Sequence, residues 1–249
     1  SFIGVRSEAT LSEKDGLAYW QGTAPAGAPT GIDPLEALRL SAAHLKSPKI
    51  PGLPPLTGGL VGFMGYDVVR RLERLPDLTT KDIPLPELSF MLTSDLAVLD
   101  HSDGTITLIA NAINWDGSDD RIDEAYESCM QRLDRMQADL STPLSGEAAE
   151  IPDFSLPDYI GNISGEQFKE NILKVKEEIL AGEAFQVVLS QRFAMPCQAD
   201  AIDVYRMLRL NNPSPYMYLF RFTDGIEIVG SSPEALVKVN QKDVMIHPI

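Results

Sequence analysis

A glutamine, a glutamate and a proline-rich bend in the last third of the chain are the residues best suited to chemistry. Gln186 interrupts the apolar run EAFQVVLSQRF, Glu234 closes the sequence GSSPE, and Asn212 opens the sequence NPSPYM. A carboxyl group can act as a general acid, whereas a neutral amide can orient a nucleophile without removing its proton. Two prolines fix the backbone of the bend, so Tyr216 and Met217 are presented in one orientation. The bend could therefore form a wall of a small apolar cleft that suits an aromatic ligand.

Each of these residues also has a plainer interpretation. Gln186 could be a solvent-facing strand residue, Glu234 an exposed carboxylate at a turn, and the bend a simple connection from helix to strand. The functional interpretation of Glu234 rests on its surroundings, because a carboxyl group enclosed beside an anionic substrate has a raised pKa. Such a group could donate a proton near neutral pH. We interpret His247 as a strand residue rather than a catalyst.

Composition restricts the class of protein. The chain has 249 residues and a formal net charge of −15, which argues against a nucleic-acid partner, since phosphate binding needs clustered Lys and Arg. Cys129 and Cys197 lie far apart without a partner motif, as expected for the reducing cytoplasm and for a protein without structural zinc. The three histidines are scattered, no signal peptide is visible, and no apolar run approaches the length of about 20 residues that spans a bilayer.

The pattern of residues 1–140 predicts a first domain of strands and helices. Asp33 caps a helix that starts at Pro34 and has an apolar face of Leu35, Leu38 and Ala42. The Gly-rich stretch 58–65 lacks the spacing of a P-loop or a dinucleotide fingerprint, so close strand packing is expected there. Strands are predicted at 2–5 and 17–21 around a turn at 13–16, and at 91–100 and 105–113 as a pair. A long helix is predicted at 119–140, with the apolar stripe Ile122, Tyr126, Met130 and Leu133.

We predict a linker at residues 141–163, because this segment is rich in Ser, Pro, Gly and Glu. A second domain follows at 164–249. Its first helix has a capping-box pattern of Ser164 and Gln167 and ends at Gly182, and Asp200 caps another helix that ends near Asn211. A strand is predicted at 183–195, and hairpins at 216–222 with 226–230 and at 235–239 with 244–249. Consecutive hairpins imply an antiparallel sheet with helices packed on one face.

These segments together resemble one enzyme family over the whole chain. The segments GGLVGFMGYDVVRRLERLP, ITLIANAINWD, EAFQVVLSQRF, NPSPYMYLF, VGSSPEALVKV and HPI are similar to the large subunit of anthranilate synthase, in its actinobacterial form. The resemblance implies an α+β fold, with an antiparallel β-sheet sandwich flanked by helices. It also implies conversion of chorismate and ammonia to anthranilate and pyruvate in tryptophan synthesis, with feedback inhibition by tryptophan.

The resemblance gives each candidate residue a role. Gln186 stands where water-using relatives have a lysine base, and an amide there suits ammonia, which needs no deprotonation before it attacks. Glu234 matches the glutamate of the Ser-Pro-Glu motif, which protonates the departing hydroxyl of chorismate. Asn212, Pro215, Tyr216 and Met217 match a wall of the tryptophan site.

The resemblance also predicts an internal fragment, incomplete at both ends. Ser1 is not a start methionine, and the chain stops at Ile249 in a strand. The other wall of the tryptophan site, the Mg²⁺ ligands and further substrate-binding residues are expected outside 1–249, so the fragment alone is expected to be inactive. A glutaminase subunit, in a cytoplasmic heterotetramer, is expected to supply ammonia.

Two other functions remain open from the sequence. An aminodeoxychorismate synthase component of folate synthesis shares the fold and the attack by ammonia, and the residue that separates the two branches would follow Ile249. A catalytically inactive tryptophan-binding fragment is the other alternative.

Overall fold

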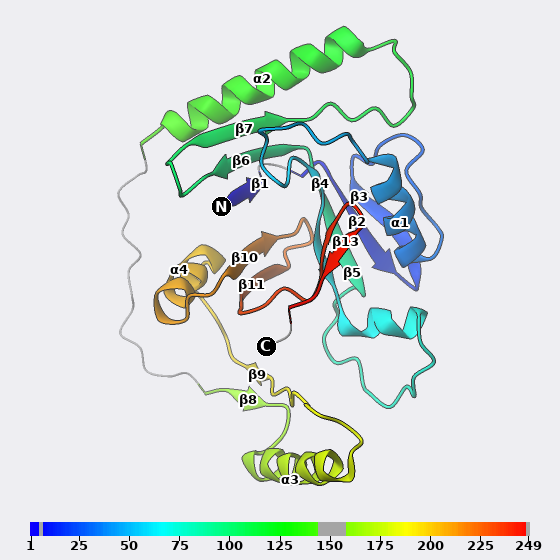
Figure 1. The fold of residues 1–249 in the computed structure, drawn as a ribbon, viewed down its shortest axis with the longest axis vertical. Coiled ribbons are helices and arrows are strands. Elements are labelled where there is room, and N and C mark those ends of the chain that lie inside the picture. The colour runs from blue at the N-terminus through cyan, green and yellow to red at the C-terminus, as the bar shows by residue number, and fades with distance from the viewer. Residues whose placement is uncertain (5–6, 144–157, 248–249) are drawn as a thin grey trace. The chain divides into compact units, whose positions relative to one another are not determined.

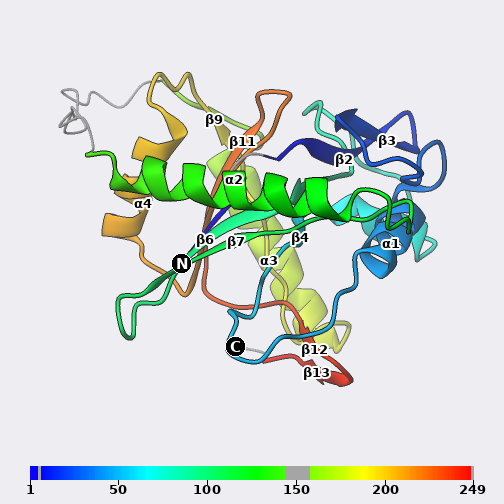
Figure 2. The same ribbon diagram turned by 90° about the horizontal axis from the view of Figure 1, so that it is seen from above.

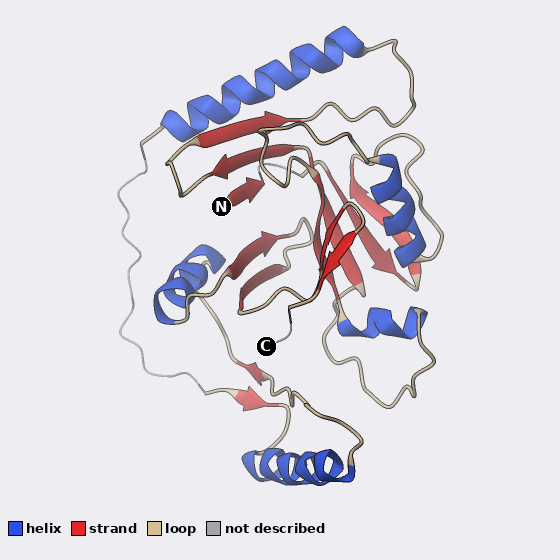
Figure 3. Cartoon of the chain, in the orientation of Figure 1, coloured by secondary structure: helices blue, strands red, loops and turns tan. Residues whose placement is uncertain are grey.

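The computed structural model describes residues 1–4, 7–143 and 158–247, and its contacts divide the chain into two compact units (Figure 1). The first unit comprises Ser1–Ser145 with Phe220–Ile228, and the second comprises Gly146–Leu219 with Val229–Ile249. Helices and antiparallel strands occur in both units (Figure 3), so the predicted α+β class is confirmed.

The first unit contains two antiparallel sheets. The four-stranded sheet has the order β3-β2-β5-β4 and is made of β2 (Ala9–Lys14), β3 (Leu17–Gly22), β4 (Gly59–Met64) and β5 (Leu88–Thr93). The three-stranded sheet has the order β1-β6-β7 and is made of β1 (Phe2–Gly4), β6 (Asp95–Leu99) and β7 (Ile106–Ala110).

The strand predicted at 91–100 is wrong, because the chain leaves one sheet and enters the other at Ser94. Strand β5 pairs with β2 and β4, whereas β6 pairs with β1 and β7. The backbone carbonyl of Ser94 accepts hydrogen bonds from the backbone N–H of Asn111 at 3.0 Å and from the Asn111 side chain at 2.8 Å. The pairing of β6 with β7 across the predicted turn is confirmed.

The first predicted pair of strands also needs correction. The turn at Asp15 and Gly16 is present, but it joins β3 to β2, which the prediction missed. Residues 2–4 pair instead with β6 in the other sheet. Strand β2 has only Ala9 and Leu11 as apolar residues, and its buried Thr10 and Ser12 hide the alternating pattern of a half-buried strand.

Helix α1 (Pro34–His44) begins as predicted. The Asp33 carboxylate accepts hydrogen bonds from the N–H groups of Leu35 and Glu36, both at 3.0 Å. The fully buried residues are Pro34, Ala37 and Ser41, and Ala37 packs with Leu11, Ala18 and Leu88 of the sheet. Of the predicted face, Leu38 packs against this cluster and Leu35 is half-buried, whereas Ala42 is exposed. Small residues at this contact let the helix approach the strands closely.

Close strand packing at the Gly-rich stretch is confirmed. A Cβ atom added to Gly62 in β4 would lie 1.9 Å from the carbonyl oxygen of Ser89 in β5. The short 3₁₀ helix η1 (Tyr66–Arg71) follows this strand. Arg71 ends it and bridges Asp33 at 2.6 Å and Glu87 at 2.7 Å. This arginine therefore ties the start of α1 to the loop before β5.

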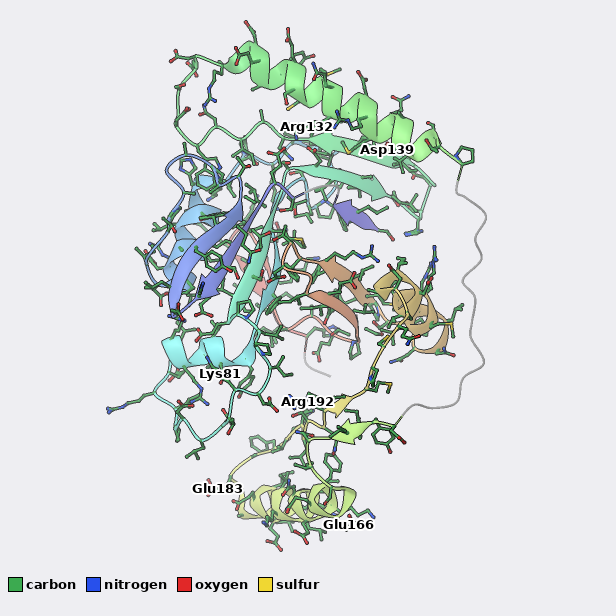
Figure 4. The ribbon with its side chains drawn as sticks, turned by 180° about the vertical axis from the view of Figure 1, so that it is seen from behind. Lys81, Arg132, Asp139, Glu166, Glu183 and Arg192 are labelled. Carbon is green, nitrogen blue, oxygen red and sulfur yellow. The ribbon has the colours of Figure 1, made fainter. Side chains whose placement is uncertain are left out.

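Helix α2 (Ile122–Ser141) lies along β7 (Figure 2). Met136 is its buried residue. Of the predicted stripe, Ile122, Tyr126 and Met130 are exposed and Leu133 is half-buried, so most of the predicted face is wrong. Arg132 reaches the sheet from the buried side (Figure 4), where its guanidinium pairs with Asp95 and donates to the carbonyl of Asn111 at 2.9 Å. A charged anchor thus fixes the helix, and periodicity of apolar residues cannot reveal such an anchor.

The second unit contains two helices and short strand pairs. Its elements are β8 (Ile160–Gly161), α3 (Gly165–Ala181), β9 (Phe193–Ala194), α4 (Ala201–Asn211), β10 (Tyr216–Arg221), β11 (Glu227–Ser232), β12 (Lys238–Asn240) and β13 (Asp243–Met245). Strands β10 and β11 extend into the first unit as the hairpin tip Phe220–Ile228. The pair β12-β13 is a shorter form of the hairpin predicted at 235–249.

The helix ends of this unit follow the sequence closely. The Ser164 hydroxyl accepts a hydrogen bond from the N–H of Gln167 at 3.1 Å, but the Gln167 side chain turns to Glu170 and Asn171 instead of completing a capping box. Gly182 ends α3 in the left-handed conformation, as predicted. Within the predicted linker 141–163, residues 144–157 lie outside the described residues, and β8 lies at its end.

The strand predicted at 183–195 is wrong. Only Phe193 and Ala194 pair with another strand, which is β8. The residues before them are largely exposed, and Val188 has an exposed fraction of 83%. Alternating apolar residues form a strand only where a neighbouring strand pairs with the backbone and a core covers one face. No such neighbour occurs among the described residues.

Candidate functional site

An open pocket of about 490 Å³ lies within the second unit. It is lined by residues from the bend before β10, the loop after β11 and the β12-β13 pair, namely Pro215, Tyr216, Pro233, Glu234, Ala235, Lys238, Met245 and His247. The lining combines apolar and aromatic side chains with the three ionisable groups of Glu234, Lys238 and His247. This combination suits a small carboxylate ligand with an unsaturated or aromatic ring.

The bend that carries Pro215 is positioned by the end of helix α4. The Asp200 carboxylate caps the start of this helix through the N–H of Ile202 at 2.8 Å. Asn212 caps its end, where its own N–H donates to Leu208 at 2.8 Å. Pro213 follows directly, so the helix cannot continue. Tyr216 then begins β10, and its ring is half exposed on the pocket.

Glu234 is positioned by the end of strand β11. The hydroxyl of Ser232 donates to the backbone carbonyl of Glu234 at 3.0 Å. The hydroxyl of Ser231 donates to the backbone carbonyl of Asn212 at 2.7 Å. Pro233 stands between these serines and Glu234 and restricts the backbone of the loop. The loop and the bend are therefore held together at the pocket.

The ionisable side chains of the pocket are available to a ligand. Glu234, Lys238 and His247 form no hydrogen bond or ion pair through their side chains with other residues in the described part of the chain. Lys238 could bind a carboxylate, His247 could bind an anion or exchange a proton, and Glu234 could donate a proton. The pocket can thus both hold an anion and protonate a leaving group.

The structure brings together some of the predicted site residues. Pro215, Tyr216 and Glu234 line the same pocket. Asn212 is not a lining residue, but its backbone carbonyl accepts the hydrogen bond from Ser231. Met217 lies next to Tyr216 in β10 and is half-buried outside the lining residues. Gln186 is exposed in the segment that does not form the predicted strand, and it is not a lining residue.

The sequence interpretation missed three contributors to this pocket. Lys238 and Met245 are paired across β12 and β13, and both line the pocket. His247 follows the end of β13 at Met245 and lines the pocket, whereas it was interpreted as a strand residue. A hairpin predicted only by its ends does not reveal its register, and register decides which side chains meet.

The described residues do not fit a metal site. Among residues 1–4, 7–143 and 158–247, no three His, Cys, Asp or Glu side chains gather closely enough to hold an ion. The Mg²⁺ that the resemblance implies is therefore assigned to no residue here. Within the same ranges no helix is long and apolar enough to cross a membrane.

The pocket could hold a small carboxylate, and comparison with known proteins gives the family. Residues 8–249 match the model of the chorismate binding enzymes, and the chain belongs to that family. The anthranilate synthase component 1 of Mycolicibacterium smegmatis is 50% identical over 254 residues, which cover 100% of this chain and 48% of the relative. The component 1 of Arthrobacter globiformis is 46% identical over 257 residues, covering 100% of the chain and 48% of the relative.

A solved structure is similar in fold. The crystal structure of anthranilate synthase component I from Streptococcus pneumoniae matches 98% of this chain and 52% of its own, with a TM-score of 0.77 and 27% identity. The chain spans about half the length of the curated relatives it matches.

Proposed function

We propose that this chain is the pocket-forming part of an anthranilate synthase large subunit, which converts chorismate and ammonia to anthranilate and pyruvate. The observation that carries the proposal is the pocket that brings Glu234 together with Lys238 and His247. Relatives called anthranilate synthase component 1 match every part of the chain, at 46% and 50% identity in the two cases given above. Tryptophan synthesis is the pathway that this activity serves.

In the proposed mechanism Glu234 donates a proton to the hydroxyl group of chorismate. Ammonia attacks the ring, the hydroxyl leaves as water, and loss of pyruvate then restores aromaticity. Glu234 suits this step because its side chain is half-buried at the pocket and unpaired among the described residues. Lys238 would offset the negative charge of the substrate, which carries two carboxylates, and His247 could donate a hydrogen bond to a carboxylate.

Three further parts of the proposal extend beyond the pocket. Gln186 is proposed to orient ammonia, and this role requires it to move from its exposed position to the substrate. Asn212, Pro215, Tyr216 and Met217 are proposed to form one wall of a site where tryptophan inhibits. A glutaminase partner, in a cytoplasmic heterotetramer, is proposed to supply the ammonia, and Mg²⁺ is proposed to hold the substrate through residues outside this chain.

A chimera tests the proposed activity. This chain would replace the matching segment of the M. smegmatis relative, and the product formed from chorismate and ammonium would be identified by fluorescence and mass. Anthranilate is the expected product, and the unfused chain is expected to form none. An amino-chorismate that retains its pyruvyl group would instead indicate the aminodeoxychorismate branch. No turnover, with tryptophan bound, would indicate a binding fragment.

A further inference from the structure

Ser231 joins the two motifs to which the proposed function assigns different roles. Its hydroxyl donates to the backbone carbonyl of Asn212 at 2.7 Å, although the two residues are 19 positions apart in sequence. Asn212 opens the bend that leads to Pro215 and Tyr216, and Ser231 lies three residues before Glu234. This hydrogen bond therefore links the proposed tryptophan wall to the proposed proton donor.

The bend has few hydrogen bonds of its own. Pro213 and Pro215 carry no N–H group, so Ser214 supplies the only backbone donor between Asn212 and Tyr216. The Ser214 hydroxyl is buried and has no partner among the described residues. A segment with so little internal bonding depends on its neighbours for its position, and the hydroxyl of Ser231 is one such neighbour.

The strand that carries Ser231 is held firmly next to this contact. A Cβ atom added to Gly230 would lie 2.1 Å from Cζ of Tyr218, so the tyrosine ring lies directly over the glycine backbone. On the other side, Ser232 donates to the carbonyl of Glu234 at 3.0 Å. A displacement of the bend would therefore pull on Ser231, and the stiff loop after it would carry the displacement to Glu234.

We propose that Ser231 is a positioning residue that couples the Asn212–Tyr216 bend to Glu234. This inference rests on the proposed function, because it assigns to that site a route by which tryptophan at the bend changes the position of the proton donor. The route needs no movement of one unit against the other. Tryptophan on Tyr216 would also lie in the pocket that Glu234 lines, and the hydrogen bond from the Ser231 hydroxyl to the Asn212 carbonyl would add to this direct contact.

Activity of the chimera provides the first test. Ser231→Ala removes the hydroxyl, and we expect the half-inhibitory tryptophan concentration to rise about tenfold, the usual size of coupling between two sites. Ser231→Thr keeps a hydroxyl on a β-branched side chain that suits a strand, and inhibition should be restored. Ser232→Ala should also weaken inhibition, because the route to Glu234 includes the Ser232 hydroxyl. Ser102→Ala is the control, since it removes an exposed hydroxyl that binds Asp100, and tryptophan inhibition should be unchanged. Inhibition of Ser231→Ala at the wild-type concentration would overturn the proposal.

Resonances of the 249-residue chain provide a second test that requires no activity. If the hydrogen bond couples the motifs, Ser231→Ala should shift the backbone amide signals of both Tyr216 and Glu234, whereas Ser232→Ala should shift that of Glu234 alone. An unmoved Tyr216 signal in Ser231→Ala would refute the coupling. If the wild-type chimera is active yet insensitive to tryptophan, the proposed tryptophan site fails, and this second test still decides the role of Ser231.

Discussion

At the scale of single residues, the pair of Arg132 and Asp95 shows how a charge can hold a helix to a sheet. The two side chains have exposed fractions of 24% and 10%. Burial raises the pKa of Asp95 above its usual value, although the charge of Arg132 and the hydrogen bond from Ser94 oppose this shift. The carboxylate is thus buried at a cost that Arg132 reduces.

Removal of Arg132 should be costly. We expect Arg132→Met to lower the free energy of unfolding by about 3 kcal/mol, because it leaves a buried carboxylate without its partner. Arg121→Met is the control, since the bridge from Arg121 to Asp116 is exposed and should contribute at most about 1 kcal/mol. Urea unfolding measures both, and equal losses would contradict this account.

The same pair predicts a dependence on pH. Because the pKa of Asp95 is raised in the folded state, the folded protein binds the proton first as the pH falls. The stability that protonation of Asp95 contributes is present below the pKa that Asp95 has in the unfolded chain. It is lost as the pH rises through the pKa that Asp95 has in the folded protein. Without Arg132 the folded pKa should rise further. The destabilisation by Arg132→Met should therefore be larger at pH 7 than near pH 4, and a constant difference would count against it.

The pKa of Asp33 is shifted in the opposite direction from that of Asp95. Burial alone would raise its pKa, but hydrogen bonds from the Glu36 N–H and Arg71, the charge of Arg71 and the N–H of Leu35 together lower it. The stability that Asp33 contributes is present above the unfolded pKa and lost as the pH falls below about 4. Asp33→Ala should cost about 1 kcal/mol at pH 7, whereas Asp33→Asn should cost less because an amide oxygen also caps a helix. Thermal unfolding compares them, and an equal loss in both variants would mean that the cap is unimportant.

At the scale of elements, the four-stranded sheet depends on a glycine. Gly62→Ala would place a methyl group 1.9 Å from the Ser89 carbonyl, so β4 and β5 must separate, and we expect a loss of about 2–3 kcal/mol from this overpacking. Gly165→Ala is the control, since nothing lies within 4 Å of its added Cβ atom. Chemical denaturation should show a larger loss in the free energy of unfolding for Gly62→Ala than for Gly165→Ala. Equal stabilities would show that β4 and β5 can move apart without loss of stability.

Local signals in the sequence predicted the elements that local interactions decide. The caps at Asp33, Ser164 and Asp200 and the stop at Gly182 involve residues within a few positions of one another, so spacing alone predicted them. The switch of sheets at Ser94 and the charged anchor of α2 depend on partners far along the chain. Contacts of that range leave no periodic pattern in the sequence.

The residues of the candidate site show the same difference between local signals and long-range contacts. The Ser-Pro-Glu and Asn-Pro-Ser-Pro motifs were visible as sequence, and they line one pocket. The contribution of Lys238 and Met245 depends on the register of β12 with β13, which the sequence does not reveal. The hydrogen bond of Ser231 to Asn212 could not have been predicted either, because one serine in a strand resembles any other.

At the scale of the whole molecule, the segment before β9 exposes apolar residues that the sequence placed in a strand. Phe185 is fully exposed and Val188 nearly so. Exposed apolar segments with free backbone groups pair readily with other chains. We therefore expect the 249-residue chain to self-associate through residues 183–190 as its concentration rises.

Charged substitutions can test this association. Phe185→Lys with Val188→Lys should reduce self-association without loss of stability, because neither side chain is buried. Leu78→Lys changes an equally exposed leucine of the first unit and should leave association unchanged. Light scattering across a range of concentrations would show the difference, and a similar response from both variants would remove residues 183–190 from the explanation.

The proposed role of Glu234 is to donate the proton with which the hydroxyl group of chorismate leaves. Its most direct test is the turnover number of the chimera with Glu234→Gln, which keeps the size of the side chain and removes the acid. We expect turnover to fall about 100-fold or more, the usual contribution of a general acid, with the KM for chorismate little changed. A Glu234→Gln chimera that forms anthranilate at the wild-type rate would contradict the account.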